Sequence, residues 1–498
     1  MRSPAPILIV LTVLTVLFAS CAPSLSQPQS IAPNPAALEA VRVERHIIDG
    51  FNEPHTPKEL NKAVYLRYLS GQTAKPRAII VLMPGILGGA TNFDRMARTI
   101  ISQDKTLEVW AIDRRSNLLE DHSKLLKSWN ANDPLIAWHW FIRDAGKPGG
   151  FKARPSSELG FMGYWGLETH LNDLRAVILE ARARAPKVLL GGHSLGSVLV
   201  TMYAGWTFSD QTAAGEPGSK SIDGLILLDG AAGNTLAADI SQADYENGFD
   251  SGFAKTAGSK ALESGQALPY FDALGISPTG LAKLSSAALL ARFDPNGDSP
   301  GGFVPYPASN LAAGLLGNAG GDNDYSPIPA FSLSAGHAQG ATALNLFAVL
   351  LSGWNGFSIG TITGPLPGSS RVEWVAGKPG EQEFTDPLDF ANRFWSPLAD
   401  FQEWYFPARL TLDLAAVRLE APTWAQSKLP LRHLGELKIP ILTAIGGRGI
   451  VTQANAFSKL EAKIGRKLEP KVAIGLTHLD VLAATNNPIA GWITEFSR

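Results

Sequence analysis

Ser194 is the residue of this chain best placed to act as a nucleophile. It lies in Gly192-His193-Ser194-Leu195-Gly196, which follows the apolar run 187–191 and precedes Ser197-Val198-Leu199-Val200. This order predicts a strand, a sharp turn and a helix, the context in which a G-x-S-x-G sequence displays a reactive serine. The small residues two positions before and after let strand and helix approach closely, and the turn lifts the hydroxyl clear of the sheet edge. Ser194 is therefore predicted to be a nucleophile that needs a base.

The elements around this turn are predicted from the hydrophobic pattern. Mostly apolar runs bounded by Gly, Pro or Asp indicate parallel strands buried on both faces, namely 78–83, 107–112, 187–190, 224–228 and 439–445. Two earlier segments, 41–47 and 64–69, alternate apolar and polar residues, which is typical of exposed antiparallel strands at a sheet edge. Helical patterns such as 166–184 lie between strands. The alternation predicts an α/β fold with helices on both faces of the sheet.

A long insertion interrupts this alternation. Between Ala231 and Pro430 it gives way to Gly-rich loops and short helical patches that hold five of the twelve tryptophans. We interpret this segment as a cap. A shorter insertion at 130–163 contains Trp138 and Trp140 and could contribute to the same cap. Most of these aromatic residues are expected to form the core of the cap itself.

The order of these features resembles the α/β-hydrolase superfamily over about Val41–Arg498, with the cap as the variable part. The resemblance implies a mostly parallel sheet with helices on both faces and a large cap inserted between the sixth and seventh strands. Residues 79–89 look like the family's strand and oxyanion loop, although Pro84-Gly85 stands where His-Gly is usual. The matching oxyanion donors are the backbone amides of Ile86 and Leu195. A simple strand-to-helix turn is the alternative interpretation of the first loop.

The resemblance also implies a histidine and an acid, in the chain order Ser, acid, His. His478 follows the apolar run 471–474 within a segment similar to the family's Gly-x-x-His. A histidine titrates near pH ~6.5 and can take the serine proton and return it to the leaving group. The remaining candidates are interpreted as packing or polar surface residues: His122, His193 and His337.

The acid departs from the usual pattern. Many family members have Gly-x-x-Asp after the strand at 439–445, but here that segment reads Gly446-Gly447-Arg448-Gly449, with no Asp or Glu at 439–460. Some members place the acid after the preceding strand, where this chain has Asp229. Asp229 is therefore predicted to orient His478, against the alternative of a structural, loop-capping aspartate. Asp480 is a weaker candidate, and Asp113 is expected to order the loop after the fourth strand.

The N-terminus has the pattern of an export signal. Arg2 precedes an apolar run at 7–18, too short for the ~20 residues of a spanning helix, and Ala19-Ser20-Cys21 follows. Small residues before Cys21, the only cysteine, resemble the lipobox of bacterial lipoproteins, although Phe18 is less usual there than Leu. The resemblance implies lipidation at Cys21 and export to the periplasmic or outer side of a bacterial membrane, with 22–37 as a flexible tether. A plain signal peptide with an accidental cysteine is the alternative.

Composition limits the partners. The 498 residues are 45% hydrophobic and 18% charged, with a net charge of −2, so no basic excess indicates nucleic-acid binding. The Asp-rich segment 294–298 lacks the glycine and glutamate that an EF-hand requires, because Ser299 and Pro305 stand there. No His/Cys cluster has zinc-ligand spacing. Neither a metal nor an organic cofactor is predicted.

These observations predict a serine hydrolase that acts by two-step acyl transfer on a small-molecule or lipid-like carboxylic ester, in an apolar, capped pocket. A serine peptidase or amidase of the same fold is the nearest alternative, and an inactive binding lipoprotein is a second. The predicted organisation divides the chain at the following bounds: a signal peptide at 1–20, a tether at 21–40, core segments at 41–230 and 431–498, and the cap at 231–430. The oligomeric state is left open.

Overall fold

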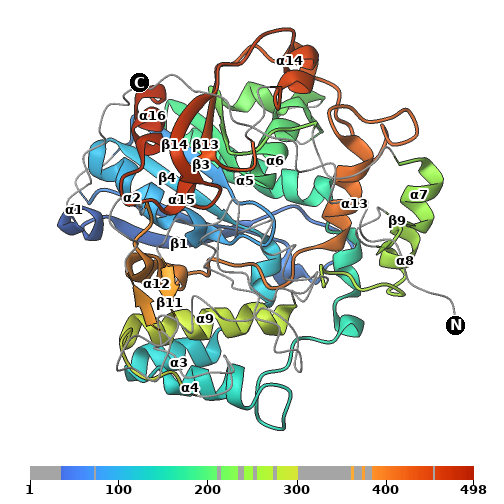
Figure 1. Ribbon diagram of the computed structural model, residues 1–498. Helices are drawn as coiled ribbons and strands as arrows, with labels where there is room; N and C mark the ends of the chain where they lie inside the picture. The colour runs from blue at the N-terminus through green and yellow to red at the C-terminus, as the bar shows by residue number, and fades with distance from the viewer. Residues whose placement is uncertain are drawn as a thin grey trace, which may run out of the picture.

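A twisted eight-stranded sheet forms the centre of the computed structural model (Figure 1). The structure describes residues 35–71, 75–209, 215–233, 240–250, 255–272, 277–300, 361–363, 373–375, 384–451 and 455–498. The strand order is β1-β2-β4-β3-β5-β8-β13-β14. The strands are β1 Arg42–Asp49, β2 Lys62–Leu69, β3 Ala78–Met83, β4 Leu107–Asp113, β5 Lys187–His193, β8 Gly224–Leu228, β13 Ile441–Arg448 and β14 Lys471–Thr477.

Only β2 runs against its neighbours. It pairs antiparallel with β1 and β4, whereas every other neighbouring pair in the sheet is parallel. The predicted α/β class with a mostly parallel sheet is confirmed. One expectation is wrong: β2 is neither exposed nor at the edge, because it lies between β1 and β4 and is mostly buried. Its polar residue Arg67 is accommodated by an ion pair with Glu108 of β4 at 2.6 Å.

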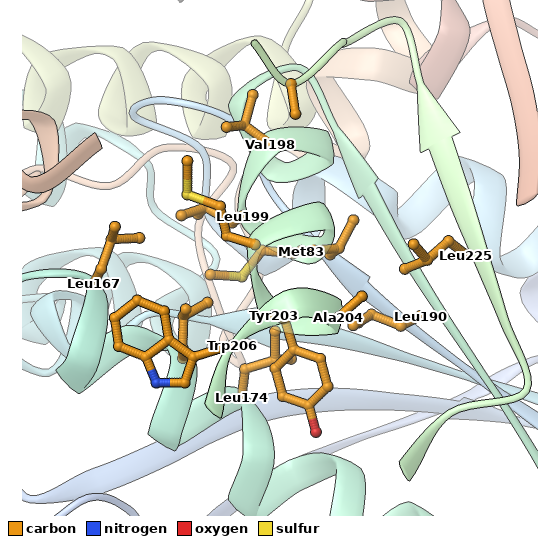
Figure 2. Close-up of a cluster of buried hydrophobic side chains, with 14 of the residues drawn as sticks. Met83, Leu167, Leu174, Leu190, Val198, Leu199, Tyr203, Ala204, Trp206 and Leu225 are labelled. Atoms are coloured by element: carbon orange, nitrogen blue, oxygen red, sulfur yellow. The ribbon is translucent and has the colours of Figure 1, made fainter. Parts of the chain in front are cut away.

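Helices cover both faces of the sheet, as buried parallel strands require. On one face α5 (Leu167–Arg184) and α6 (Leu195–Gly205) pack against β3, β5 and β8. Figure 2 shows side chains of α6, including Leu199 and Tyr203, beside Met83, Leu190 and Leu225 of these strands. On the other face α2 (Asp94–Gln103) and α16 (Pro488–Phe496) close a second apolar cluster. The sheet is thereby fixed from both sides.

The chain between the sixth strand, β8, and the seventh, β13, contributes to two different cores. Helices α9 (Pro278–Phe293) and α12 (Pro387–Phe394) pack with α3 (Ser123–Ala131) and α4 (Leu135–Trp138), below the sheet in Figure 1. Trp138, Trp395 and Trp404 are buried together in this cluster, so the two insertions share a core. Helix α13 (Ala408–Val417) packs instead in the cluster of α5 and α6.

The remaining elements are short. The helices are α1 Pro35–Glu39, α7 Gln242–Asn247, α8 Ser259–Glu263, α14 Ser458–Ile464 and α15 Asp480–Ala483, and the two-stranded pairs are β6 Thr207–Phe208 with β7 Glu216–Pro217, β9 Phe249–Asp250 with β10 Lys255–Thr256, and β11 Thr361–Thr363 with β12 Glu373–Val375. Within the described ranges no helix combines the length and hydropathy needed to cross a bilayer. Cys21 and His337 lie outside the described residues.

Candidate active site

The turn between β5 and α6 holds Ser194 in a conformation that few residues adopt. Ser194 has φ 57° and ψ −123°, and such backbone strain costs about 1–3 kcal/mol unless the surroundings impose it. Its amide donates to the carbonyl of Leu228 at 2.9 Å, which fixes the turn to the end of β8. The predicted strand, sharp turn and helix are therefore present, and strain is concentrated at the predicted nucleophile.

The flanking glycines are required by close packing. A Cβ atom on Gly192 would overlap with the carbonyl group of Gly196, and one on Gly196 would overlap with the carbonyl oxygen of Met83 in β3. Neither position has room for a side chain. The glycines thus let α6 begin directly over the ends of β3 and β5.

The loop after β3 passes beside Ser194. A Cβ atom on Gly85 would lie 2.9 Å from the Ser194 Cβ and 3.4 Å from its Oγ, so this backbone approaches the hydroxyl closely. Leu195 is the first residue of α6, where backbone amides have no partner within the helix. Among the described residues, neither its amide nor that of Ile86 has a recorded acceptor. Both predicted oxyanion donors thus belong to backbone that adjoins Ser194.

A buried arginine holds this loop. The Arg114 guanidinium, which follows β4, donates to the carbonyls of Pro84, Gly85 and Gly88 at 2.6, 2.7 and 3.1 Å. It also pairs with Glu403 at 2.5 Å, and both side chains are completely buried. Glu403 belongs to the insertion, and its amide donates to the Leu87 carbonyl at 2.9 Å. This pair was not predicted from the sequence, because two polar residues 289 positions apart give no local signal.

His478 and Asp229 meet at the carboxyl ends of the parallel strands. His478 follows β14, Asp229 follows β8, and the His478 Nδ1 lies 2.6 Å from the Asp229 Oδ2. An ionised carboxylate only accepts hydrogen bonds, so Nδ1 carries the proton and Nε2 is left free to accept one. The structure therefore brings together the two residues that the sequence analysis paired.

The surroundings of Asp229 favour its charged form. Burial alone would raise the pKa of this carboxyl, but the hydrogen bond and charge of His478 and the Ile450 amide outweigh burial and lower the pKa below its usual value. The Ile450 amide donates at 2.9 Å and the Gly446 amide at 3.3 Å. Asp229 has φ 41°, a left-handed conformation that aspartate tolerates better than most residues.

Gly449 explains why the usual position of the acid is empty. A Cβ atom at Gly449 would overlap with both carboxylate oxygens of Asp229. The carboxylate thus fills the space that a side chain after β13 would occupy. The acid approaches His478 from β8, and glycine at 449 is the consequence.

His193, interpreted from the sequence as a packing residue, has a specific contact. Its Nε2 lies 2.9 Å from the carbonyl oxygen of His478, to which it donates. Burial, helped by the nearby His478, lowers the pKa of His193 to about 3, and the ring is therefore neutral. It holds the backbone that carries His478.

The other acids have partners of their own. Asp480 accepts from the Thr477 amide at 3.1 Å and from the Thr477 hydroxyl at 2.8 Å. Asp113 accepts from the Ala90 amide at 3.1 Å, and so orders the loop beyond β3. Both are used in local structure.

Neither a protein-family model nor a curated protein matches this sequence. Solved structures do. A provisionally assigned lipase from Sulfolobus solfataricus aligns with 12% identity and a TM-score of 0.47 over 92% of this chain and 95% of its own. A carboxyl esterase from Bacillus coagulans aligns with 14% identity and a TM-score of 0.37 over 91% and 97%. A peroxisomal alpha-beta-hydrolase from Saccharomyces cerevisiae aligns with 9% identity and a TM-score of 0.38 over 92% and 88%.

These proteins are what the chain is similar to, and their activities are their own. The chain has the α/β-hydrolase fold, as its strand order with a single antiparallel strand and its turn between β5 and α6 show.

Proposed function

We propose that this protein is a serine hydrolase that acts by two-step acyl transfer. The observation that carries the proposal is the 2.6 Å contact between His478 Nδ1 and Asp229, made at the same sheet edge as the strained Ser194. A serine in such a turn, a histidine with an orienting carboxylate and two free backbone amides are the parts that acyl transfer needs.

In the proposed reaction the Ser194 Oγ attacks the carbonyl carbon of the substrate while His478 Nε2 takes the hydroxyl proton. Asp229 keeps the other ring nitrogen protonated and stabilises the imidazolium. The amides of Ile86 and Leu195 donate to the oxyanion, and each such donor contributes on the order of 10²–10³ in turnover. His478 then protonates the leaving group, and a water molecule, activated by the same ring, releases the acyl group.

The proposed substrate is an uncharged carboxylic ester. Support comes from the aromatic insertion, whose described part packs against the backbone beside Ser194: the Gly89 amide donates to the Phe401 carbonyl at 2.8 Å. We propose that the segment 231–430 caps the site and supplies an apolar pocket. An amide substrate is the competing possibility, since the same residues cleave amides.

A fluorophosphonate probe tests the chemistry before any substrate is known. The purified protein should be labelled at Ser194, and Ser194→Ala should abolish labelling while the fold is kept. Ser197→Ala is the matched control, because Ser197 lies one turn into α6 and donates to the Gly192 carbonyl at 2.6 Å. Absence of labelling in the wild type would favour an inactive binding protein.

A second assay separates ester from amide substrates. Turnover of nitrophenyl esters of increasing acyl length should exceed that of the matching nitroanilides, with a preference for uncharged acyl groups. Activity confined to peptides would favour the peptidase alternative.

We further propose that Cys21 anchors the enzyme by a lipid to a bacterial membrane, on its periplasmic or cell-surface side. The support is the short apolar run before Ala19-Ser20-Cys21. Cys21→Ser should move the protein from the membrane fraction to the soluble fraction or leave the leader uncleaved. Unchanged partition and an unchanged mature N-terminus would contradict the anchor.

A further inference from the structure

A second buried cluster of titratable side chains lies where the core meets the insertion. Glu120 and His122 follow the short helical turn after β4, and Asp400 comes from the loop after α12. The His122 Nε2 lies 3.0 Å from Glu120 Oε2 and 3.8 Å from Asp400 Oδ2. The three ligand atoms all lie within 4.8 Å of one another.

These separations suit one shared ion. Two ligand atoms at ~2.1 Å from a tetrahedral zinc ion lie roughly 3.4 Å apart, midway between the two His122 distances. A neutral imidazole with two carboxylates is a donor set that zinc and similar transition metals accept, whereas Ca²⁺ takes six to eight oxygen ligands. The donor set therefore points to a transition metal.

The charge of the cluster also calls for a cation. The carboxylate side chains of Glu120 and Asp400 are 0% and 1% exposed, and the only ion-pair partner recorded for either in the described ranges is His122. One imidazolium would balance only one of the two charges. Burying an unbalanced carboxylate is costly, so the second needs a metal ion or a proton.

Neighbouring donors orient the two carboxylates. The Ser285 hydroxyl and the Trp404 indole donate to Asp400 Oδ2 at 2.5 and 3.2 Å. The Trp404 amide donates to Glu120 Oε1 at 2.7 Å, which leaves Oε2 directed to His122. Hydrogen bonds to ligating carboxylates are typical of metal sites, and at Asp400 a bound metal would share Oδ2 with these two donors.

We propose that Glu120, His122 and Asp400 bind one divalent transition-metal ion of the zinc class, which ties the chain after β4 to the insertion. The role is structural, and it does not depend on the proposed acyl transfer. An ion that binds the folded state raises the midpoint of unfolding in proportion to the logarithm of its free concentration. Three protein ligands leave one tetrahedral position for water.

The test uses the purified protein stripped with a chelator and then titrated with zinc chloride. We expect about one zinc per chain by elemental analysis after desalting, and a Tm that rises with zinc concentration. His122→Gln and Asp400→Asn should each lose both effects. His433→Gln is the matched control, because His433 pairs with Glu436 at 3.0 Å on the surface. Asp229→Asn, in the proposed active site, should retain zinc.

Zinc retention also gives the results that would contradict the metal site. No zinc retained by the wild type, or equal retention by His122→Gln and the wild type, would overturn the proposal and leave a shared proton as the balancing charge. If both variants fail to fold, cobalt-loaded wild type decides, because a ligand-field absorption spectrum that saturates at about one cobalt per chain is expected. A spectrum of free aqueous cobalt would overturn the proposal.

Discussion

The group at His478 and the group at His122 each place a histidine nitrogen against a buried carboxylate, and their electrostatics differ. At the sheet edge, His478 lies 2.6 Å from Asp229, and the pKa of Asp229 is lowered. Where the core meets the insertion, the His122 Nε2 faces carboxylate oxygens of both Glu120 and Asp400. Burial raises the pKa of Asp400 to about 7, although the hydrogen bond from Ser285 acts in the opposite direction. Similar side chains thus have pKa values shifted in opposite directions.

The difference lies in the ratio of donors to carboxylates. Asp229 is a single carboxylate that receives one imidazole and the amides of Ile450 and Gly446. In the second group two carboxylates share one imidazole, and the charge of Asp400 raises the pKa of Glu120 in addition to burial. A close histidine–carboxylate contact is therefore not evidence of catalysis by itself. Proximity to the Ser194 turn distinguishes the first group.

Exchanging the acid for its amide in both groups gives the largest expected contrast. Asp229→Asn should keep the fold but stabilise the wrong tautomer of His478, and kcat for an ester should fall on the order of 10⁴-fold. Asp400→Asn should leave kcat nearly unchanged and alter thermal stability instead. Measured kcat and Tm for the two variants make the comparison.

The decrease in kcat caused by Asp229→Asn should not add to the decrease caused by Ser194→Ala, since the two residues act as one unit. A kcat of Asp229→Asn near that of the wild type would remove Asp229 from the mechanism. An equal fall for Asp400→Asn would remove the distinction between the groups.

Another buried carboxylate, Glu403, sharpens the comparison because it has its own cation. Glu403 pairs with Arg114, which also holds the loop at Pro84 and Gly85. Arg114→Met leaves a buried charge unpaired and should cost roughly 3–5 kcal/mol in the free energy of unfolding. It should also displace the Ile86 amide and lower kcat by up to ~10²–10³-fold, the value of one oxyanion donor.

The double variant Arg114→Met/Glu403→Leu is the control for charge. It should recover much of the unfolding free energy, since both charges of this pair are removed, but not kcat, because the loop carbonyls keep no donor. Recovery of both would show that Arg114 acts on stability alone.

Moving the acid between strands tests why Gly449 is a glycine. Gly449→Asp alone should lower stability and activity, because its Cβ overlaps with the Asp229 oxygens. In Asp229→Gly/Gly449→Asp that overlap is absent, and glycine suits the φ of 41° at position 229. The double variant should exceed the kcat of Asp229→Gly by roughly tenfold or more if the new carboxylate reaches His478. No gain would show that only the end of β8 can supply the acid.

Local patterns predicted most of the fold. The apolar runs at 78–83 and 224–228 match β3 and β8 residue for residue, and the helix expected at 166–184 is α5 at Leu167–Arg184. Buried parallel strands and a glycine-flanked turn leave a strong signal because burial and backbone strain restrict each residue individually. The pairing of Asp229 with His478 could be predicted because both residues follow parallel strands of one sheet.

Long-range polar pairs gave no such signal. Arg114 with Glu403, and Glu120 and His122 with Asp400, join segments nearly three hundred residues apart, and their residue types are common on surfaces. The wrong prediction for β2 has the same origin. The alternation of apolar and polar residues in β2 predicted an exposed strand, but the ion pair between Arg67 and Glu108 allows a charged residue to be buried within the sheet.

Acid should act on stability through two buried histidines that stay neutral in the folded protein. Burial is the main cause that lowers the pKa of both His193 and His170 to about 3, whereas the unfolded chain titrates near pH ~6.5. Below that pH the unfolded state binds protons that the folded state does not. The contribution of each of these two histidines to the free energy of unfolding should therefore fall as the pH decreases from ~6.5 toward ~3, by up to about 1.4 kcal/mol per pH unit. Urea unfolding at pH 7, 6 and 5 measures how steeply the free energy of unfolding changes with pH.

In His170→Gln the side-chain amide can still donate to the Gly166 carbonyl that His170 contacts at 2.7 Å. This variant should reduce the slope of unfolding free energy against pH by about one proton. An identical slope in this variant would mean that His170 becomes protonated inside the fold.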